Sequence, residues 1–238
     1  MDNSATSFMP AAAALDATPA LLSKTHHLFE ILGQAIISGE CSLHFLSSEM
    51  AIEKHYDVSR SVAREAILML RAKGLVSSST KQGLRVEPLE KWNLIDPDVL
   101  RWIANGPFST RIFEEIIQVR LAIEPRAAYL AALKGDPAVQ QTLRGHYSKI
   151  LHNKSDKDQL NSAQLAFHLC IIEASGNRFM RAFETLLMTA TNLAARPQYS
   201  GPQVSFSTDY GEIVDAVEKS KPQLAEYSMK YIIGAHLS

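Results

Sequence analysis

The sequence is poor in cysteine, since its 238 residues include only Cys41 and Cys170. Two unpatterned cysteines cannot build a disulfide framework or a metal-binding knuckle, and they suit a reducing compartment. Long apolar runs are also missing, because no stretch approaches the roughly 20 residues that a membrane-spanning helix needs. Residues 1–23 contain no lysine or arginine, so they lack the basic start of a secretory signal and are expected to form a disordered tail. These absences favour a cytoplasmic location without a membrane partner.

Patterns typical of enzymes are absent as well. The sequence has no glycine-rich phosphate loop, no Cys–His or Ser–His–Asp arrangement and no pair of acids on one helical face. Its eight histidines show no metal-ligand spacing. We therefore expect no enzymatic activity, no metal and no other cofactor. The length and the 46% hydrophobic content allow one large or two modest globular domains.

Positive charge is concentrated in one segment. Residues 54–88 contain seven lysines or arginines and three acids, which gives this segment a net charge of +4. Because the whole chain carries −1, the remainder carries −5. A basic module on an acidic body is typical of a regulator of which only one part touches DNA.

Residues 57–86 have the pattern of a DNA-reading helix followed by a small hairpin. Ser59 can accept hydrogen bonds from the free amides of a helix's first turn, and Gly74 marks the end of that helix. One side of the helix is apolar, whereas the other side carries Arg60, Ser61, Arg64 and Arg71. Two short strands are predicted over residues 75–80 and 84–87, around the turn Lys81-Gln82-Gly83.

The upstream residues complete a winged helix-turn-helix. An apolar stripe predicts a first helix that stops at Gly39, and Ser48 can cap a second helix that runs to Tyr56. The order of helix, helix, tight turn, arginine-bearing helix and hairpin is typical of winged DNA-binding domains. The alternative is that the arginines are only the solvated face of a helix in an all-α domain.

A family resemblance favours the first interpretation. Residues 48–76, SEMAIEKHYDVSRSVAREAILMLRAKGLV, resemble the operator-binding domain of GntR-type bacterial regulators. Residues 92–102, WNLIDPDVLRW, are similar to the linker helix of the FadR branch, which includes sugar-acid regulators. The resemblance implies a mainly α protein with a winged helix over residues 24–88, a linker and linker helix over 89–107 and an all-α, FCD-type effector-sensing domain over 108–238. Four residues are expected to pack where the linker joins the domains: Trp92, Leu94, Leu100 and Trp102.

The sensing domain is predicted to contain only helices. Apolar stripes, caps and breaks place them over residues 109–135, 137–153, 156–174, 177–196, 208–220 and 222–234, with a loop over 197–207.

The resemblance also implies which residues contact DNA. Arg60 and Arg64 fall on the base-reading positions, and a guanidinium can donate two hydrogen bonds to O6 and N7 of guanine. Hydroxyl groups suit phosphate oxygens, and a glycine lets a wing tip approach the minor groove. Met50 stands where some relatives carry another DNA-contacting arginine, so one contact is expected to be missing. The implied DNA-binding set is Ser59, Arg60, Ser61, Arg64, Lys81, Gln82 and Gly83.

The sensing domain departs from its relatives at their metal site. Many relatives bind a divalent metal through an aspartate, a histidine four residues later and two histidines in the last helices. Here the first histidine is His168, but the other three positions hold Gln164, Tyr210 and Ile232. We expect no bound metal.

Other sequence patterns of the family's effector pocket are present in this chain. Arg120 and Glu124 match the family's Arg-x-x-x-Glu pattern, and residues 175–177 match its Ser-Gly-Asn turn. Our hypothesis is that Arg120 receives the carboxylate of a small acidic effector whose hydroxyls are bound by Gln164, His168, Asn177 and Tyr210. The alternative is that Arg120 and Glu124 only stabilise their helix.

The predicted function is a transcription regulator that represses a sugar-acid or other carboxylate operon. It would bind a palindromic double-stranded operator as a homodimer, and the effector would release it. A DNA-binding scaffold whose pocket no longer binds an effector is the competing prediction.

Overall fold

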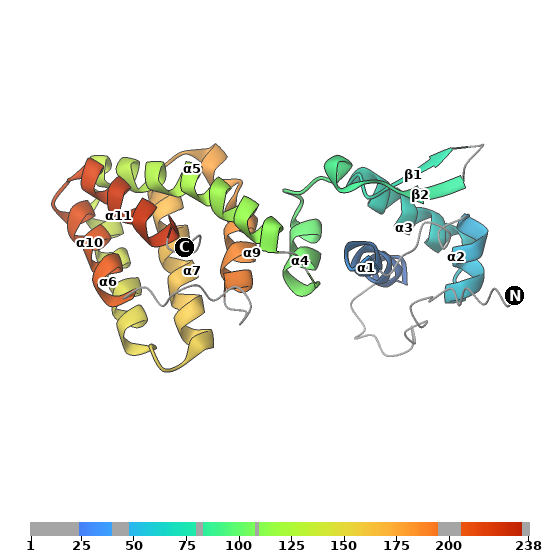
Figure 1. The fold of residues 1–238 in the computed structure, drawn as a ribbon, viewed down its shortest axis with the longest axis horizontal. Helices are drawn as coiled ribbons and strands as arrows, with labels where there is room; N and C mark the ends of the chain where they lie inside the picture. The colour runs from blue at the N-terminus through green and yellow to red at the C-terminus, as the bar shows by residue number, and fades with distance from the viewer. Residues whose placement is uncertain (1–23, 40–47, 80–82, 108–109, 195–205, 235–238) are drawn as a thin grey trace, which may run out of the picture. The chain divides into compact units, whose positions relative to one another are not determined.

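A computed structural model describes residues 24–39, 48–79, 83–107, 110–194 and 206–234 (Figure 1). Its contacts divide the chain after Pro107 into two compact units, which we describe separately. The first unit combines helices with one two-stranded sheet, and the described part of the second consists of helices. The predicted mainly α fold, with a winged helix-turn-helix before a helical domain, is confirmed. The predicted tail and residues 197–205 of the loop predicted over 197–207 lie outside the described residues.

The first unit is a winged helix-turn-helix. It consists of α1 (Lys24–Ile37), α2 (Glu49–Tyr56), α3 (Arg60–Ala72), β1 (Val76–Ser79), β2 (Gly83–Val86), the 3-10 turn η2 (Leu89–Lys91) and α4 (Pro97–Asn105). The Ser48 hydroxyl caps α2 by accepting from the Ala51 amide, and Asp57 ends that helix in a left-handed conformation. The two strands pair antiparallel, with Val76 opposite Val86 and Ser79 opposite Gly83. The short connection between α2 and α3 places α3 across α1, where both bury their apolar faces.

The linker helix α4 packs within the first unit. The Asp96 carboxylate caps it, and Pro97 occupies its first turn, where a missing N–H breaks no helical hydrogen bond. Trp102 is buried against Phe29 of α1, and its indole N–H donates to Glu30 at 2.8 Å. Arg101 donates two hydrogen bonds, of 2.6 and 2.7 Å, to the same Glu30 carboxylate. Helix α4 is therefore attached to α1.

A second set of contacts holds the start of α4 against the end of α3. The Lys73 ammonium, after the end of α3, lies 2.8 Å from carboxylate oxygens of both Asp96 and Asp98. It also lies over the Phe29 ring, 5.5 Å from the ring centroid. Leu94, which was expected to pack between the domains, is 37% exposed.

Two helical glycines provide a matched test of this packing. A Cβ at Gly33 would lie 2.3 Å from the Trp102 ring, whereas a Cβ at Gly145, within the helix Pro137–His152, would meet nothing within 4 Å. Gly33→Ala is expected to lower the free energy of unfolding by about 1–3 kcal/mol, because the ring must move. Gly145→Ala is expected to raise it by up to about 1 kcal/mol, because alanine favours a helix.

Thermal unfolding of both variants tests this prediction. Both tryptophans lie in the first unit, so tryptophan fluorescence reports Gly33→Ala and circular dichroism reports Gly145→Ala. A Gly33→Ala variant as stable as the wild type would show that Trp102 does not pack against α1 in this way.

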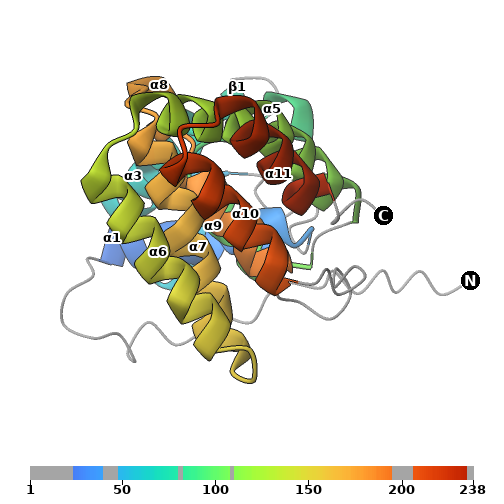
Figure 2. The ribbon, with the colours of Figure 1, turned by 90° about the vertical axis from the view of Figure 1, so that its left-hand side faces the viewer.

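The second unit is a helical bundle built around α5 (Thr110–Lys134) (Figure 2). The other helices are α6 (Pro137–His152), α7 (Lys157–Ala174), α8 (Arg178–Arg181), α9 (Glu184–Ala194), α10 (Phe206–Glu218) and α11 (Pro222–Gly234). Helix α5 packs against α7, α9, α10 and α11, and α6 packs against α7 and α10. Asp136 and Asp156 cap α6 and α7 with their carboxylates.

The prediction of one helix over residues 177–196 is wrong. The chain turns at Ala182 and Phe183, where the amides donate to carbonyls three residues back and separate α8 from α9. Helix α10 also begins at Phe206, two residues before its predicted start. No helix within the described ranges is long and apolar enough to cross a membrane.

Candidate functional site

Helix α3 presents the predicted DNA-contacting side chains on its exposed side. The Ser59 hydroxyl caps the helix by accepting from the Val62 amide, and it also lies 3.0 Å from the Ser61 hydroxyl. The opposite side is buried through Ala63, Ala66, Ile67 and Leu70. Arg60, Ser61 and Arg64 are exposed, so the guanidinium groups are free to enter a groove of DNA.

The hairpin forms the wing after α3. Gly83 opens β2 with a φ of +69°, a conformation that favours glycine. Gly74, at φ +74°, ends α3, and a Cβ there would lie 2.2 Å from the Lys91 carbonyl oxygen. Lys81 and Gln82 of the predicted set lie outside the described residues. Met50, at the start of α2, is 72% exposed and offers an apolar surface in place of a cationic one.

A cluster of buried polar side chains lies inside the second unit. Arg120 and Glu124 come from α5, His168 from α7 and Tyr210 from α10, and each is at most 3% exposed. Arg120 donates to both carboxylate oxygens of Glu124, through Nε and Nη2. His168 Nδ1 lies 2.5 Å from Glu124 Oε2, and His168 Nε2 lies 3.0 Å from the Tyr210 hydroxyl. These four residues, the buried cluster, join three helices through one chain of contacts.

Charges within the buried cluster are fixed by their neighbours. Burial by itself would raise the pKa of Glu124, but the charge of Arg120 and hydrogen bonds from His168 and Arg120 outweigh it and lower the pKa to about 2. The Glu124 charge likewise keeps the pKa of Arg120 above its ordinary value despite burial. Burial raises the pKa of Tyr210 above that of free tyrosine, so its phenol stays neutral. The cluster therefore contains a buried ion pair and a neutral phenol at pH 7.

Comparison with known proteins assigns both units. Residues 24–86 match the family of bacterial regulatory proteins called the gntR family, and residues 115–235 match the FCD domain. The chain belongs to the GntR family. It is a DNA-binding transcription regulator with an FCD domain, and not an enzyme.

Individual relatives support this assignment. The galactonate operon transcriptional repressor of Escherichia coli K12 is 22% identical over 218 residues, which cover 90% of this chain and 95% of that protein. The E. coli K12 HTH-type transcriptional regulator YieP is 31% identical over 163 residues, which cover 67% and 70% of the two chains. A solved structure of Lar, which controls the agr system of Listeria monocytogenes, has a TM-score of 0.58 at 17% identity. The match covers 92% of this chain and 97% of Lar, and at this identity it supports only a shared fold.

The cluster of this GntR regulator does not suit a divalent metal. His168 already contacts Glu124 and Tyr210 through its two ring nitrogens. The neutral Tyr210 phenol is a poor ligand, and the buried Ile232 has no donor atom. Gln164, one turn before His168 on α7, offers only a neutral amide. These residues do not fit the metal site that the family resemblance implies.

The structure brings together some of the predicted effector-binding residues. Arg120, His168 and Tyr210 are joined in the buried cluster, and Gln164 is half-buried on α7. Asn177 instead caps α8, since its side-chain oxygen accepts from the amides of Phe179 and Met180. Sequence reasoning left Glu124 out of the predicted site, although it bridges Arg120 and His168. Its position four residues after Arg120 was the available signal.

Proposed function

We propose that this regulator represses an operon for the use of a sugar acid or another carboxylate, and that a small acidic effector releases it from a palindromic operator. The exposed Arg60 and Arg64 support base reading, and the galactonate operon repressor among its relatives supports the substrate class. The observation that carries the effector proposal is a cation, Arg120, buried inside the FCD domain. We infer that the regulator acts in the cytoplasm, where the operator lies.

The effector would bind beside Arg120 and His168 of the buried cluster, next to Gln164 on α7. Glu124 accepts two of the five N–H donors of Arg120, and the remaining donors can receive the effector's carboxylate. His168, Gln164 and Tyr210 supply donors and acceptors that hydroxyl groups need. The effector can release DNA only if it binds the conformation without DNA more tightly.

Thermal-shift measurements with galactonate, gluconate, glucuronate and acetate test this proposal. At a concentration 100 times its dissociation constant, an effector should stabilise the wild type by about 2.7 kcal/mol. The double variant Arg120→Met/Glu124→Leu removes both charges together and leaves none buried alone, so its response should be lost. The exposed pair Arg111 and Glu115 has the same spacing on α5, and Arg111→Met/Glu115→Leu should respond like the wild type.

The competing function is a DNA-binding regulator that senses no effector. It is favoured by one observation: the charged groups and ring nitrogens of the cluster already contact one another. If no acid stabilises the wild type, or if a stabilising acid acts equally on the double variant, this second function replaces the first.

We also propose that the protein is a homodimer. A palindromic operator presents two half-sites related by two-fold symmetry, and one winged helix buries little surface on DNA. Analytical ultracentrifugation at micromolar concentration should give twice the 26.3 kDa chain mass. A single species of chain mass, both with and without operator DNA, would contradict the dimer.

A further inference from the structure

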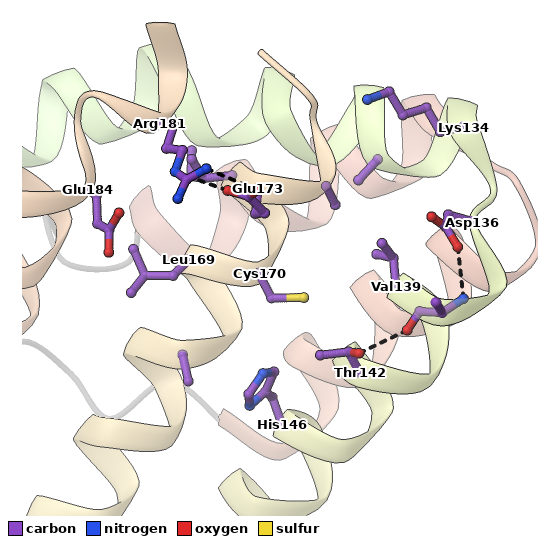
Figure 3. A pocket seen from close by; sticks show the side chains of 15 residues that line it. Lys134, Asp136, Val139, Thr142, His146, Leu169, Cys170, Glu173, Arg181 and Glu184 are labelled. Atoms are coloured by element: carbon purple, nitrogen blue, oxygen red, sulfur yellow. Dashed lines mark hydrogen bonds and ion pairs between the residues drawn. The ribbon is translucent and has the colours of Figure 1, made fainter. Parts of the chain in front are cut away.

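A groove separate from the buried cluster lies on the second unit, between α6 and α7 (Figure 3). Its volume is about 740 Å³, which is within the range of small-molecule sites. The end of α5, together with Arg181 and Glu184, completes its walls. The apolar lining is made mostly of small side chains: Ala131, Ala138, Val139, Ala166, Leu169, Ile172 and Ala174.

Some charged groups of the groove already have bonding partners, whereas Lys134 forms no ion pair within the described ranges. Asp136 caps α6, and Glu173 pairs with Arg181 at 3.3 Å. The Lys134 ammonium lies against Gly176, where a Cβ would be 1.9 Å from Nζ, and it forms no ion pair with the described residues. Glu184 lies at the opposite end of the groove from Lys134 (Figure 3). Lys134 is thus the lining cation that is left for an anionic ligand.

The other titratable groups of the floor, His146 and Cys170, carry no charge that a ligand could pair with. His146 Nδ1 is shielded from solvent and has no hydrogen-bond partner among the described residues. Burial, followed by the charge of Lys149, lowers the pKa of His146, so the ring is neutral and can donate or accept. Burial, with the charge of Glu173, raises the pKa of the Cys170 thiol, which makes it a packing group rather than a nucleophile.

We propose that this groove binds an amphipathic monocarboxylate, with its apolar body over the alanine-rich floor and its carboxylate at Lys134. The alanines leave room for a flat or extended body, and the apolar floor supplies most of the binding free energy. The groove lies along the α7 side chains Ala166, Leu169, Cys170 and Glu173, whereas His168 points into the bundle core. The site therefore does not depend on the effector proposed for Arg120.

Calorimetric titration of the full chain with indole-3-acetate tests the proposal, because this probe has an aromatic body, an N–H donor and a carboxylate. Tryptamine is the matched probe in which an ammonium replaces the carboxylate, and it should bind more weakly. Lys134→Gln should weaken indole-3-acetate binding about two- to fivefold, as expected for an exposed ion pair. Lys154→Gln, which removes an exposed lysine outside the groove, should leave the affinity unchanged.

Substitutions that fill the groove should lower the affinity for indole-3-acetate more than Lys134→Gln does. Ala166→Phe should abolish binding. Thr142→Trp should also abolish it, and this position is exposed on α6, so the core is unchanged. Methyl NMR should show ligand-induced shifts at Val139 and Leu169, and binding should persist in Arg120→Met/Glu124→Leu. Equal affinity for tryptamine, full affinity after Thr142→Trp or shifts confined to other methyl groups would each overturn the proposal.

Discussion

Arg60→Ala and Arg64→Ala are each expected to weaken specific operator binding by roughly 5- to 150-fold, which corresponds to about 1–3 kcal/mol for one lost bidentate guanine contact. Both side chains are exposed on the first two turns of α3, so neither supports the core. The buried face of α3 is unchanged in both variants, and their unfolding temperatures should match the wild type. The loss should also be specific to one base pair for each arginine.

Fluorescence anisotropy on an operator mapped by genome-wide binding provides the measurement. The salt concentration must be held constant, because phosphate contacts make affinity strongly salt-dependent. Arg71→Ala is the matched control, since Arg71 is exposed in the last turn of the same helix. Unchanged affinity and an unchanged footprint in both α3 variants would show that these arginines form only a solvated face. The genes beside the mapped sites would also identify the regulated operon.

The buried ion pair should give the largest effect on stability. Glu124→Leu leaves the Arg120 guanidinium buried without its acid, and the expected loss is about 3–5 kcal/mol of unfolding free energy. Glu115→Leu breaks an ion pair of the same spacing on the same helix, but its side chains are 85% and 50% exposed. Its expected loss is below about 0.5 kcal/mol, since water solvates the remaining Arg111 charge.

Urea unfolding followed by circular dichroism distinguishes these outcomes. Arg120→Met/Glu124→Leu should recover most of the stability lost in Glu124→Leu, because replacing a whole buried pair by apolar groups is often nearly neutral. An equal loss in Glu124→Leu and Glu115→Leu would mean that water reaches Arg120. Failure of the double variant to recover would assign the loss to packing rather than to the unpaired charge.

The Arg120–Glu124 ion pair also makes the free energy of unfolding depend on pH in the acid range. The pKa of Glu124 is about 2 in the folded protein, below its ordinary value of 4.5, so the folded state favours the charged form. Its contribution to stability is fully present above about pH 4.5 and is lost as the pH falls toward 2. The double variant lacks this carboxylate, so its stability should fall less steeply over that interval. Parallel pH profiles for the two proteins would contradict the assignment.

The sequence by itself determined the local elements of this protein. Ser48, Ser59, Asp96 and Asp136 each cap the helix that the sequence predicts after them, because a cap bonds to amides two or three residues away. The apolar stripe of α3 and the glycine-bounded hairpin are equally local. The break at Ala182 and Phe183 escaped prediction, since no proline or glycine marks it and neighbouring residues favour a helix.

Only the tertiary structure decided where those elements meet. The Glu30 carboxylate binds Arg101 and Trp102 more than 70 positions later, and this contact attaches α4 to the first unit. Glu124 bridges Arg120 to His168, although helical spacing by itself indicated only its contact with Arg120. The groove beside Lys134 gathers small apolar residues of three helices that show no pattern in the sequence. Capping and periodicity act over a few residues, whereas these contacts depend on how whole helices pack, which spacing along the chain does not specify.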